Sequence, residues 1–189
     1  MFDNFVEKNI LVLKKYGVNI KTEDDQELYR YGLKIIYSYI VNLSITLLVA
    51  VLLNRLYESA IMIFIFAMFQ IFGGGYHAST KLKCLLITVM GLIAGNIMIS
   101  IILNYSLFMI VSAVVLSVII IVLGPVTNEN HPVNKKTFKR SACIERIIVL
   151  LNFFIMVLLL TLNKNIEAAV IVSIFYLYVV SLITAKIKR

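Results

Sequence analysis

Six long apolar segments constrain this 189-residue chain more than any other feature of its sequence. They cover residues 33–53, 60–72, 85–103, 107–123, 147–162 and 168–185. A helix that crosses the hydrocarbon core of a bilayer needs about 20 predominantly apolar residues. The chain is 61% hydrophobic and only 15% charged, whereas roughly a quarter of a soluble domain is charged. We therefore predict an all-α, polytopic integral membrane protein with about six transmembrane helices.

The distribution of positive charge predicts the orientation of these helices. If all six segments cross the bilayer, 16 of the 18 Lys and Arg residues share a side with the N-terminus, and only Arg55 and Lys164 lie opposite. Lys and Arg are enriched in cytoplasmic loops, so we predict that both termini are cytoplasmic. The segment 60–72 is short, and a re-entrant path there would change the count. Topology and anionic lipid headgroups account for the net charge of +8, so we expect membrane lipids as partners and no nucleic acid.

Residues 1–31 precede the first predicted span and are amphipathic. Apolar residues recur there at helical spacing: Phe2, Phe5, Val6, Ile10 and Leu13. The pattern predicts a helix that either lies in the headgroup plane or packs on a neighbouring helix. Thr22 and Asp25 have the spacing of a capping signal for a second helix that continues into the first span. Together with a transmembrane bundle over 33–185, this segment is expected to form a single domain over 1–189.

The stretch "FGGGYHASTKLKC", residues 72–84, joins the second and third predicted spans on the cytoplasmic side. It contains three consecutive glycines, His77 and Cys84. A cysteine protease needs a thiolate nucleophile and a histidine that acts as its general base and acid. In a continuous helix the seven-residue spacing would separate the two residues by about 10 Å along the axis, too far for a hydrogen bond. A catalytic dyad therefore requires the helix to break between His77 and Cys84.

The sequence offers such a break, because Ser79 or Thr80 can N-cap the third span. Cys84 would then lie near a helix N-terminus, where the positive end of the helix dipole favours a thiolate. The glycines can adopt positive φ and allow another backbone segment to approach closely. In the alternative interpretation, Cys84 is a small residue at a helix start and His77 is a hydrogen-bonded interfacial side chain.

The predicted loop over 124–146 contains the other histidine and cysteine, His131 and Cys143. They are twelve residues apart with Pro132 between them, so a dyad is less favoured here. All four His and Cys side chains fall on the cytoplasmic side, and a zinc site is conceivable, but the spacings match no familiar ligand pair. We therefore expect no metal and no cofactor. The same loop carries a basic run, expected to face lipid and to dock an acidic peptide segment: Lys135, Lys136, Lys139 and Arg140.

The whole arrangement resembles the accessory gene regulator B (AgrB) family of bacterial membrane endopeptidases. The resemblance rests on "GGYHA" at 74–78 with Cys84 six residues after the alanine, and on the length and the six apolar segments. It also includes the "PV" and "NK" pairs at 125–126 and 134–135, so it covers essentially the full chain. One departure is Gln70, where members of the family commonly carry arginine.

The resemblance implies quorum-sensing chemistry at a bacterial cell membrane. Such enzymes cut the acidic C-terminal tail from a precursor peptide (AgrD) and close the remainder into a thiolactone or lactone. Cys84 would be the nucleophile that forms an acyl-enzyme, and His77 the general base and acid. Candidates for oxyanion or substrate binding are Gly74, Gly75, Gln70, Lys135 and Lys136. A homodimer is also implied. The alternative is a non-enzymatic peptide exporter or scaffold, in which the glycine loop is only a hinge.

Overall fold

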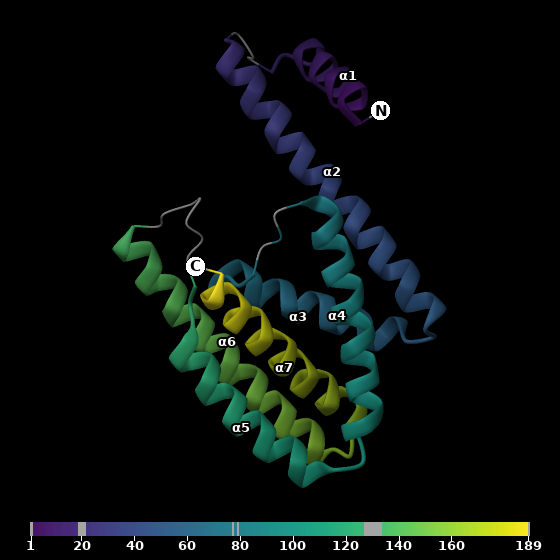
Figure 1. Cartoon of the computed structure of the whole chain (residues 1–189), viewed down its shortest axis with the longest axis vertical. Helices are drawn as coiled ribbons and strands as arrows, with labels where there is room; N and C mark the ends of the chain where they lie inside the picture. Colours follow the sequence, from purple (N-terminus) through teal and green to yellow (C-terminus); the bar gives the residue numbers. More distant parts are fainter. Residues whose placement is uncertain (1, 19–21, 77, 79, 127–133, 189) are drawn as a thin grey trace. The chain divides into compact units, whose positions relative to one another are not determined.

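The computed structural model describes residues 2–18, 22–76, 78, 80–126 and 134–188. These residues form seven α-helices and no strand (Figure 1). The helices are α1 Phe2–Lys15, α2 Glu23–Leu52, α3 Leu56–Gly73, α4 Lys81–Ile102, α5 Ser106–Leu123, α6 Lys135–Thr161 and α7 Asn165–Ile187. By length and composition, α2 to α7 can each cross a membrane, including α3, which contains the short segment 60–72. The predicted all-α protein with six membrane-spanning helices is confirmed.

The start of α6 differs from the prediction. The hydropathy pattern places 124–146 in a loop, but α6 begins at Lys135, twelve residues before its apolar segment. Residues 135–146 contain neither glycine nor proline, and Lys and Arg are good helix formers. A helix needs only its own backbone hydrogen bonds to continue into the headgroup region, so hydropathy underestimates its length.

The described residues divide into two compact units, Met1–Thr46 and Leu47–Arg189. In the first unit, Val6 and Ile10 of α1 are buried against Leu33 and Tyr37 of α2. This contact corresponds to the packing alternative for the amphipathic segment. The single domain expected over 1–189 stays a prediction.

Short-range polar contacts shape the first unit as the sequence predicts. The amide of Asp25 donates to the Thr22 hydroxyl and the amide of Thr22 donates to the Asp25 carboxylate, both at 3.1 Å. This reciprocal pair satisfies amide groups that the first turn of α2 leaves without helical partners. The predicted capping signal is therefore confirmed.

A longer-range contact, which the sequence did not predict, joins the two helices of this unit: Arg30 of α2 donates to Glu7 of α1 at 2.7 Å.

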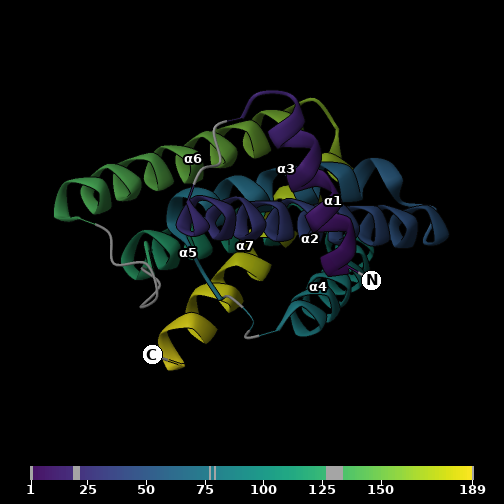
Figure 2. The same cartoon turned by 90° about the horizontal axis from the view of Figure 1, so that it is seen from above.

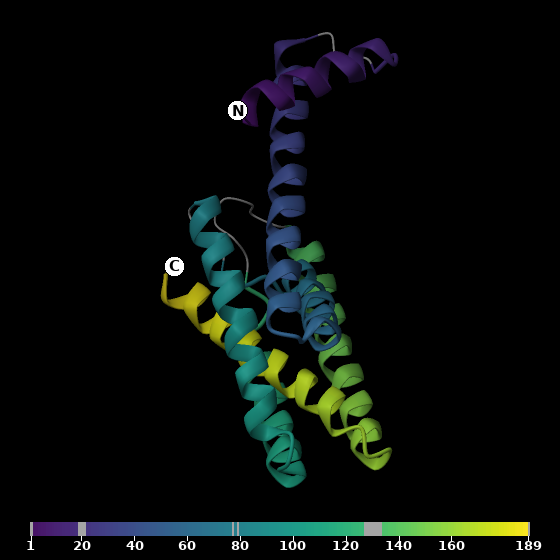
Figure 3. The same cartoon turned by 90° about the vertical axis from the view of Figure 1, so that its right-hand side faces the viewer.

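Helix α7 is the centre of the second unit. It packs against α3, α4, α5 and α6, and 61% of its apolar window is buried, compared with at most 33% for any other span. Helices α4 and α6 lie on opposite sides of the unit (Figure 2), and α7 crosses α4 obliquely (Figure 3). The positions of residues on α3, α4, α5 and α6 therefore depend on how these helices pack against α7.

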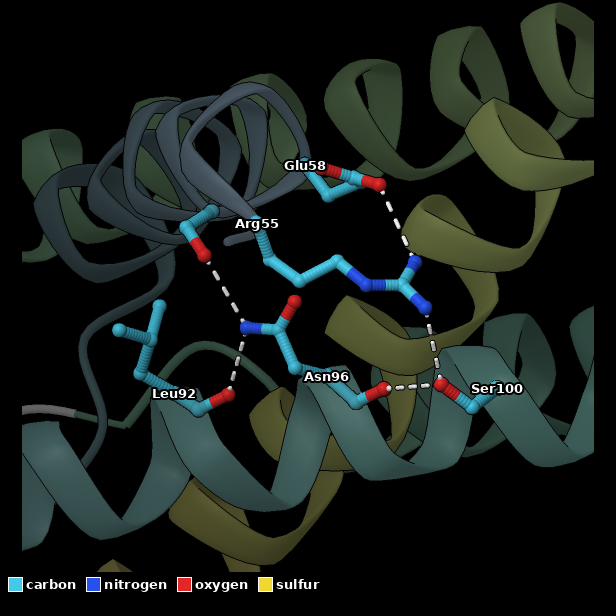
Figure 4. Close-up of polar contacts among 6 residues, drawn as sticks. Arg55, Glu58, Leu92, Asn96 and Ser100 are labelled. Carbon is cyan, nitrogen blue, oxygen red and sulfur yellow. Dashed lines mark hydrogen bonds and ion pairs between the residues drawn. The ribbon is translucent and has the colours of Figure 1, made fainter. Parts of the chain in front are cut away.

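A polar cluster joins α3 to α4 near the N-terminus of α3 (Figure 4). Arg55 donates to Glu58 at 3.1 Å and to Ser100 at 3.3 Å. The Asn96 amide, which is buried, donates to the hydroxyl of Ser59 at 3.0 Å. Interhelical hydrogen bonds of this kind stabilise helix association where lipid removes the hydrophobic driving force. The opposite end of α3 leads into the glycine-rich stretch.

Candidate active site

The glycine-rich stretch begins where α3 ends, at Gly73. Gly74 and Gly75 have φ angles of 71° and 140°, in the region that favours glycine. The amide of Val126, just after α5, donates to the carbonyl of Gly73 at 2.9 Å. Gly74 forms a parallel bridge with Val126, and a Cβ atom at Gly74 would collide with the Val126 carbonyl oxygen. The predicted close approach of a second backbone segment is confirmed at this glycine.

Helix α7 holds the other side of the same loop. The hydroxyl of Ser181 accepts hydrogen bonds from the Tyr76 amide at 3.0 Å and from the Gln70 side-chain amide at 3.3 Å. Lys188 donates to the Tyr76 hydroxyl at 2.8 Å. A Cβ atom at Gly75 would lie 2.6 Å from the Ser181 hydroxyl. Residues 73–76 are thus fixed from two directions, and Gln70 supports the loop from α3.

Cys84 lies in the first turn of α4. Thr80 caps this helix: its hydroxyl accepts from the Lys83 amide at 3.3 Å, and its carbonyl accepts from the Cys84 amide at 3.0 Å. The Cys84 side chain is exposed. Because α3 ends at Gly73 and α4 begins at Lys81, the predicted interruption between the histidine and the cysteine is confirmed, as is Thr80 as the cap.

His77 and Ser79 lie outside the described residues. The neighbours of His77 are described, and neither Tyr76 nor Ala78 is helical. The pairing of His77 with Cys84 therefore stays a prediction, whereas the position of the cysteine at the start of a helix is established.

The predicted basic run forms one end of α6. Its four members are exposed: Lys135, Lys136, Lys139 and Arg140. Within the described part of the chain, no ion pair is recorded for these side chains. Positive charge is unfavourable at a helix N-terminus because the dipole there is also positive. The charges of the run are therefore unfavourable for the helix dipole of α6, although Lys and Arg are good helix formers.

Cys143 is exposed on α6. His131 lies outside the described residues, as do residues 127–130. Among the described residues, no group of three or more His, Cys, Asp or Glu side chains could hold a metal ion. Because neither histidine is described, the zinc alternative is not tested.

Sequence reasoning missed Glu145. This side chain of α6 is only 1% exposed, and the hydroxyl of Tyr178 on α7 donates to it at 2.6 Å. A Cβ atom at either Gly73 or Gly124 would collide with the Glu145 carboxyl group. The available signal was an acidic residue two positions before an apolar segment, but hydropathy placed it in a loop.

A family model described as Accessory gene regulator B matches residues 6–184. The chain belongs to the accessory gene regulator B family. The matched range reaches into both α1 and α7, so the inferred resemblance is confirmed over nearly the whole chain. No curated protein and no solved structure matches the chain.

Membership of the AgrB family connects this protein with the accessory gene regulator system and quorum-sensing peptide processing. The partner that membership implies is a precursor of the AgrD type. The six apolar helices fit a multi-pass membrane protein. The glycine loop and the start of α4, which carry the residues of the family resemblance, lie within the matched range.

Proposed function

We propose that this AgrB-family protein is a membrane cysteine endopeptidase. It cleaves the acidic C-terminal tail from an AgrD-type precursor and cyclises the remainder through an acyl-enzyme on Cys84. The observation that carries the proposal is an exposed thiol in the first turn of α4, seven residues after His77 in the sequence, with Tyr76, Ala78 and Thr80 outside any helix. The enzyme is proposed to work on the cytoplasmic side of a bacterial cell membrane, in contact with lipid and as a homodimer. Its two described units are proposed to act as one functional domain.

Acylation begins when His77 accepts the proton of the Cys84 thiol and the thiolate attacks the carbonyl carbon of the scissile peptide bond. The C–N bond then breaks, and His77 gives the proton to the amine that leaves with the acidic tail. The acyl group remains on Cys84 as a thioester. A thiol or hydroxyl of the precursor next attacks this thioester, its proton passes through His77 to the departing Cys84 sulfur, and the ring closes.

Cyclisation has to compete with hydrolysis of the acyl-enzyme. Exchange of one thioester for another changes the free energy little, whereas hydrolysis is strongly downhill. The site must therefore exclude water and hold the internal nucleophile close to the thioester. A loop fixed on two sides at the end of two apolar helices suits this requirement, and it counts against the alternative in which the glycines form only a hinge.

The oxyanion of the tetrahedral intermediate needs positioned N–H donors. We propose the backbone amides of Gly74 and Gly75. Lys135 and Lys136 are proposed to attract the acidic tail, and Gln70 to hold the loop from which the oxyanion donors project.

Co-expression with the cognate precursor tests the proposal. We expect Cys84→Ser and His77→Ala to abolish cleavage, and mass spectrometry of the wild type to detect an acyl group on Cys84. Cys143→Ser is the matched control, because Cys143 is also exposed but lies on α6. Processing that survives both changes in the dyad and stops in the Cys143 variant would refute the mechanism. Transport of a mature peptide without processing would instead support an exporter.

A further inference from the structure

The carboxyl group of Glu145 is buried, and its burial requires a hydrogen-bond donor inside the protein to replace water. It is 1% exposed, and the hydroxyl that donates to it belongs to Tyr178, which is 0% exposed. A buried carboxyl group is unfavourable unless hydrogen bonds replace its lost contacts with water. The short 2.6 Å bond from Tyr178 supplies such a contact and fixes where the carboxyl oxygen lies.

The carboxyl group of Glu145 lies close to two chain segments, the end of α3 and the segment that follows α5. Gly73 is the last residue of α3 and Gly124 directly follows α5. A Cβ atom at either glycine would collide with the Glu145 carboxyl group, and one at Gly73 would also collide with the Tyr178 hydroxyl. Alanine at either position would therefore displace the Glu145 carboxyl group or the Tyr178 hydroxyl.

The same two segments are bonded to each other immediately beyond the carboxyl group. The Val126 amide donates to the Gly73 carbonyl at 2.9 Å, and Gly74 forms a bridge with Val126. Gly73, Gly74 and Val126 thus form a small backbone junction next to the Glu145 carboxyl group. In the sequence, Tyr76 and His77 follow this junction within four residues. A shift of the carboxyl group would be transmitted to this junction.

Two residues of α7 support the glycine loop: Tyr178 lies near Gly73, and Ser181 contacts Tyr76. The Tyr178 ring stacks on Phe69 of α3, with centroids 4.6 Å apart and 23° between the ring planes, so its hydroxyl has little freedom to move. Ser181, three residues later on α7, accepts from the Tyr76 amide. Helix α4, which carries Cys84, also packs against α7. The glycine loop and the nucleophile helix therefore have α7 as a common neighbour.

We propose that Glu145 and Tyr178 are positioning residues of the endopeptidase. They hold the backbone junction of Gly73 and Gly74 with Val126 in place against α7, so that the loop delivers His77 to Cys84. Neither side chain touches the reacting atoms. The inference rests on the proposed function, because it assigns the pair to the alignment of the catalytic dyad.

A matched pair of tyrosine variants tests this role. Tyr178→Phe removes the hydroxyl from Glu145 and keeps the ring. Tyr176→Phe, two residues away on α7, removes a hydroxyl that donates to Ser112 of α5 at 3.0 Å. We expect Tyr178→Phe to lower the single-turnover rate of Cys84 acylation about tenfold or more, the effect of losing a hydrogen bond to an ionisable group. Tyr176→Phe should remain within about threefold of the wild type.

The assay measures kcat and KM for the precursor, with rates normalised to the membrane-inserted protein. A positioning role predicts that kcat falls while KM changes little, because binding of the precursor does not need the dyad to be aligned. Equal kcat for Tyr178→Phe and Tyr176→Phe would overturn the inference. If Cys84→Ser also remained active, the endopeptidase proposal itself would fail, so the two failures are distinguishable.

A second experiment tests the role of Glu145 by compensating changes in side-chain size, with Tyr178 left unchanged. Gly124→Ala introduces a methyl group that collides with the Glu145 carboxyl group, and Glu145→Asp shortens that side chain by one methylene. We expect each single variant to lower kcat and the double variant to be more active than Gly124→Ala alone. Additive or greater loss in the double variant would show that the carboxyl group does not occupy the space beside Gly124, and would overturn the inference.

Discussion

Replacement of Gly74 by alanine is the sharpest single test of the loop geometry. Its φ and ψ angles are 71° and −149°, a combination that residues with a Cβ atom rarely adopt. The added methyl group would also meet the carbonyl oxygen of Val126. That oxygen belongs to backbone and cannot rotate away as a flexible side chain could, so the loop itself must move.

The magnitude follows from these two effects. The strained backbone costs on the order of 1–3 kcal/mol, and loss of the hydrogen bond between Val126 and Gly73 adds about 1 kcal/mol. A total of about 2–4 kcal/mol lowers the equilibrium constant for the native loop by about 30- to 700-fold. We therefore expect Gly74→Ala to reduce acylation of Cys84 at least tenfold if the native loop is the active conformation.

The assay is single-turnover formation of the acyl-enzyme, measured by mass spectrometry of purified protein with its precursor. Two glycines provide controls. Gly91 of α4 has nothing within 4 Å of an added Cβ atom, and Gly17 has a φ of 85° but the same open space. Gly91→Ala should leave acylation unchanged, and Gly17→Ala should impose strain outside the site without affecting it. Wild-type acylation by Gly74→Ala would refute the reasoning that the observed loop is the active one.

Three further predictions concern the supports of the site. Ser181→Ala removes the acceptor for two hydrogen bonds of the loop and should lower the acylation rate about tenfold, read in the same single-turnover assay; an unchanged rate would contradict the support from α7. Lys135→Gln combined with Lys136→Gln should raise KM for the precursor, and less so at high salt because screening already weakens the attraction of the acidic tail; an unchanged KM in titrations at low salt would exclude this binding role. Thr80→Ala removes the cap of α4 and should destabilise its first turn by about 1 kcal/mol, detected as faster hydrogen exchange around Cys84; an unchanged exchange rate there would contradict the capping role.

Local interactions explain why much of the fold could be predicted. The six spans follow from apolar segments long enough for a bilayer, and each of them lies in an observed helix. The capping residues Thr22 and Thr80 act on amides within three or four residues of themselves, a range over which sequence spacing is informative. The interruption between His77 and Cys84 was predictable for the same reason.

Contacts between distant segments were not predictable in this way. Gln70 and Ser181 are 111 residues apart, and Glu145 and Tyr178 are 33 apart. The sequence suggested that the consecutive glycines permit an unusual backbone, but not that each has a separate neighbour: a carboxyl group at Gly73, a backbone carbonyl at Gly74 and a serine hydroxyl at Gly75.

These contacts were not predictable because water and lipid impose different patterns on the faces of a helix. In water, an amphipathic pattern shows which face of a helix is buried, and it did so for α1. In a bilayer, the face toward lipid is as apolar as the face toward the protein: in α3, Ile71 is 70% exposed while Phe69 is fully buried. The sequence alone therefore determined the spans, their caps and the break before Cys84. Only the tertiary structure decided how α3, α4, α5 and α6 are rotated about α7, and with it which side chains meet at the glycine loop.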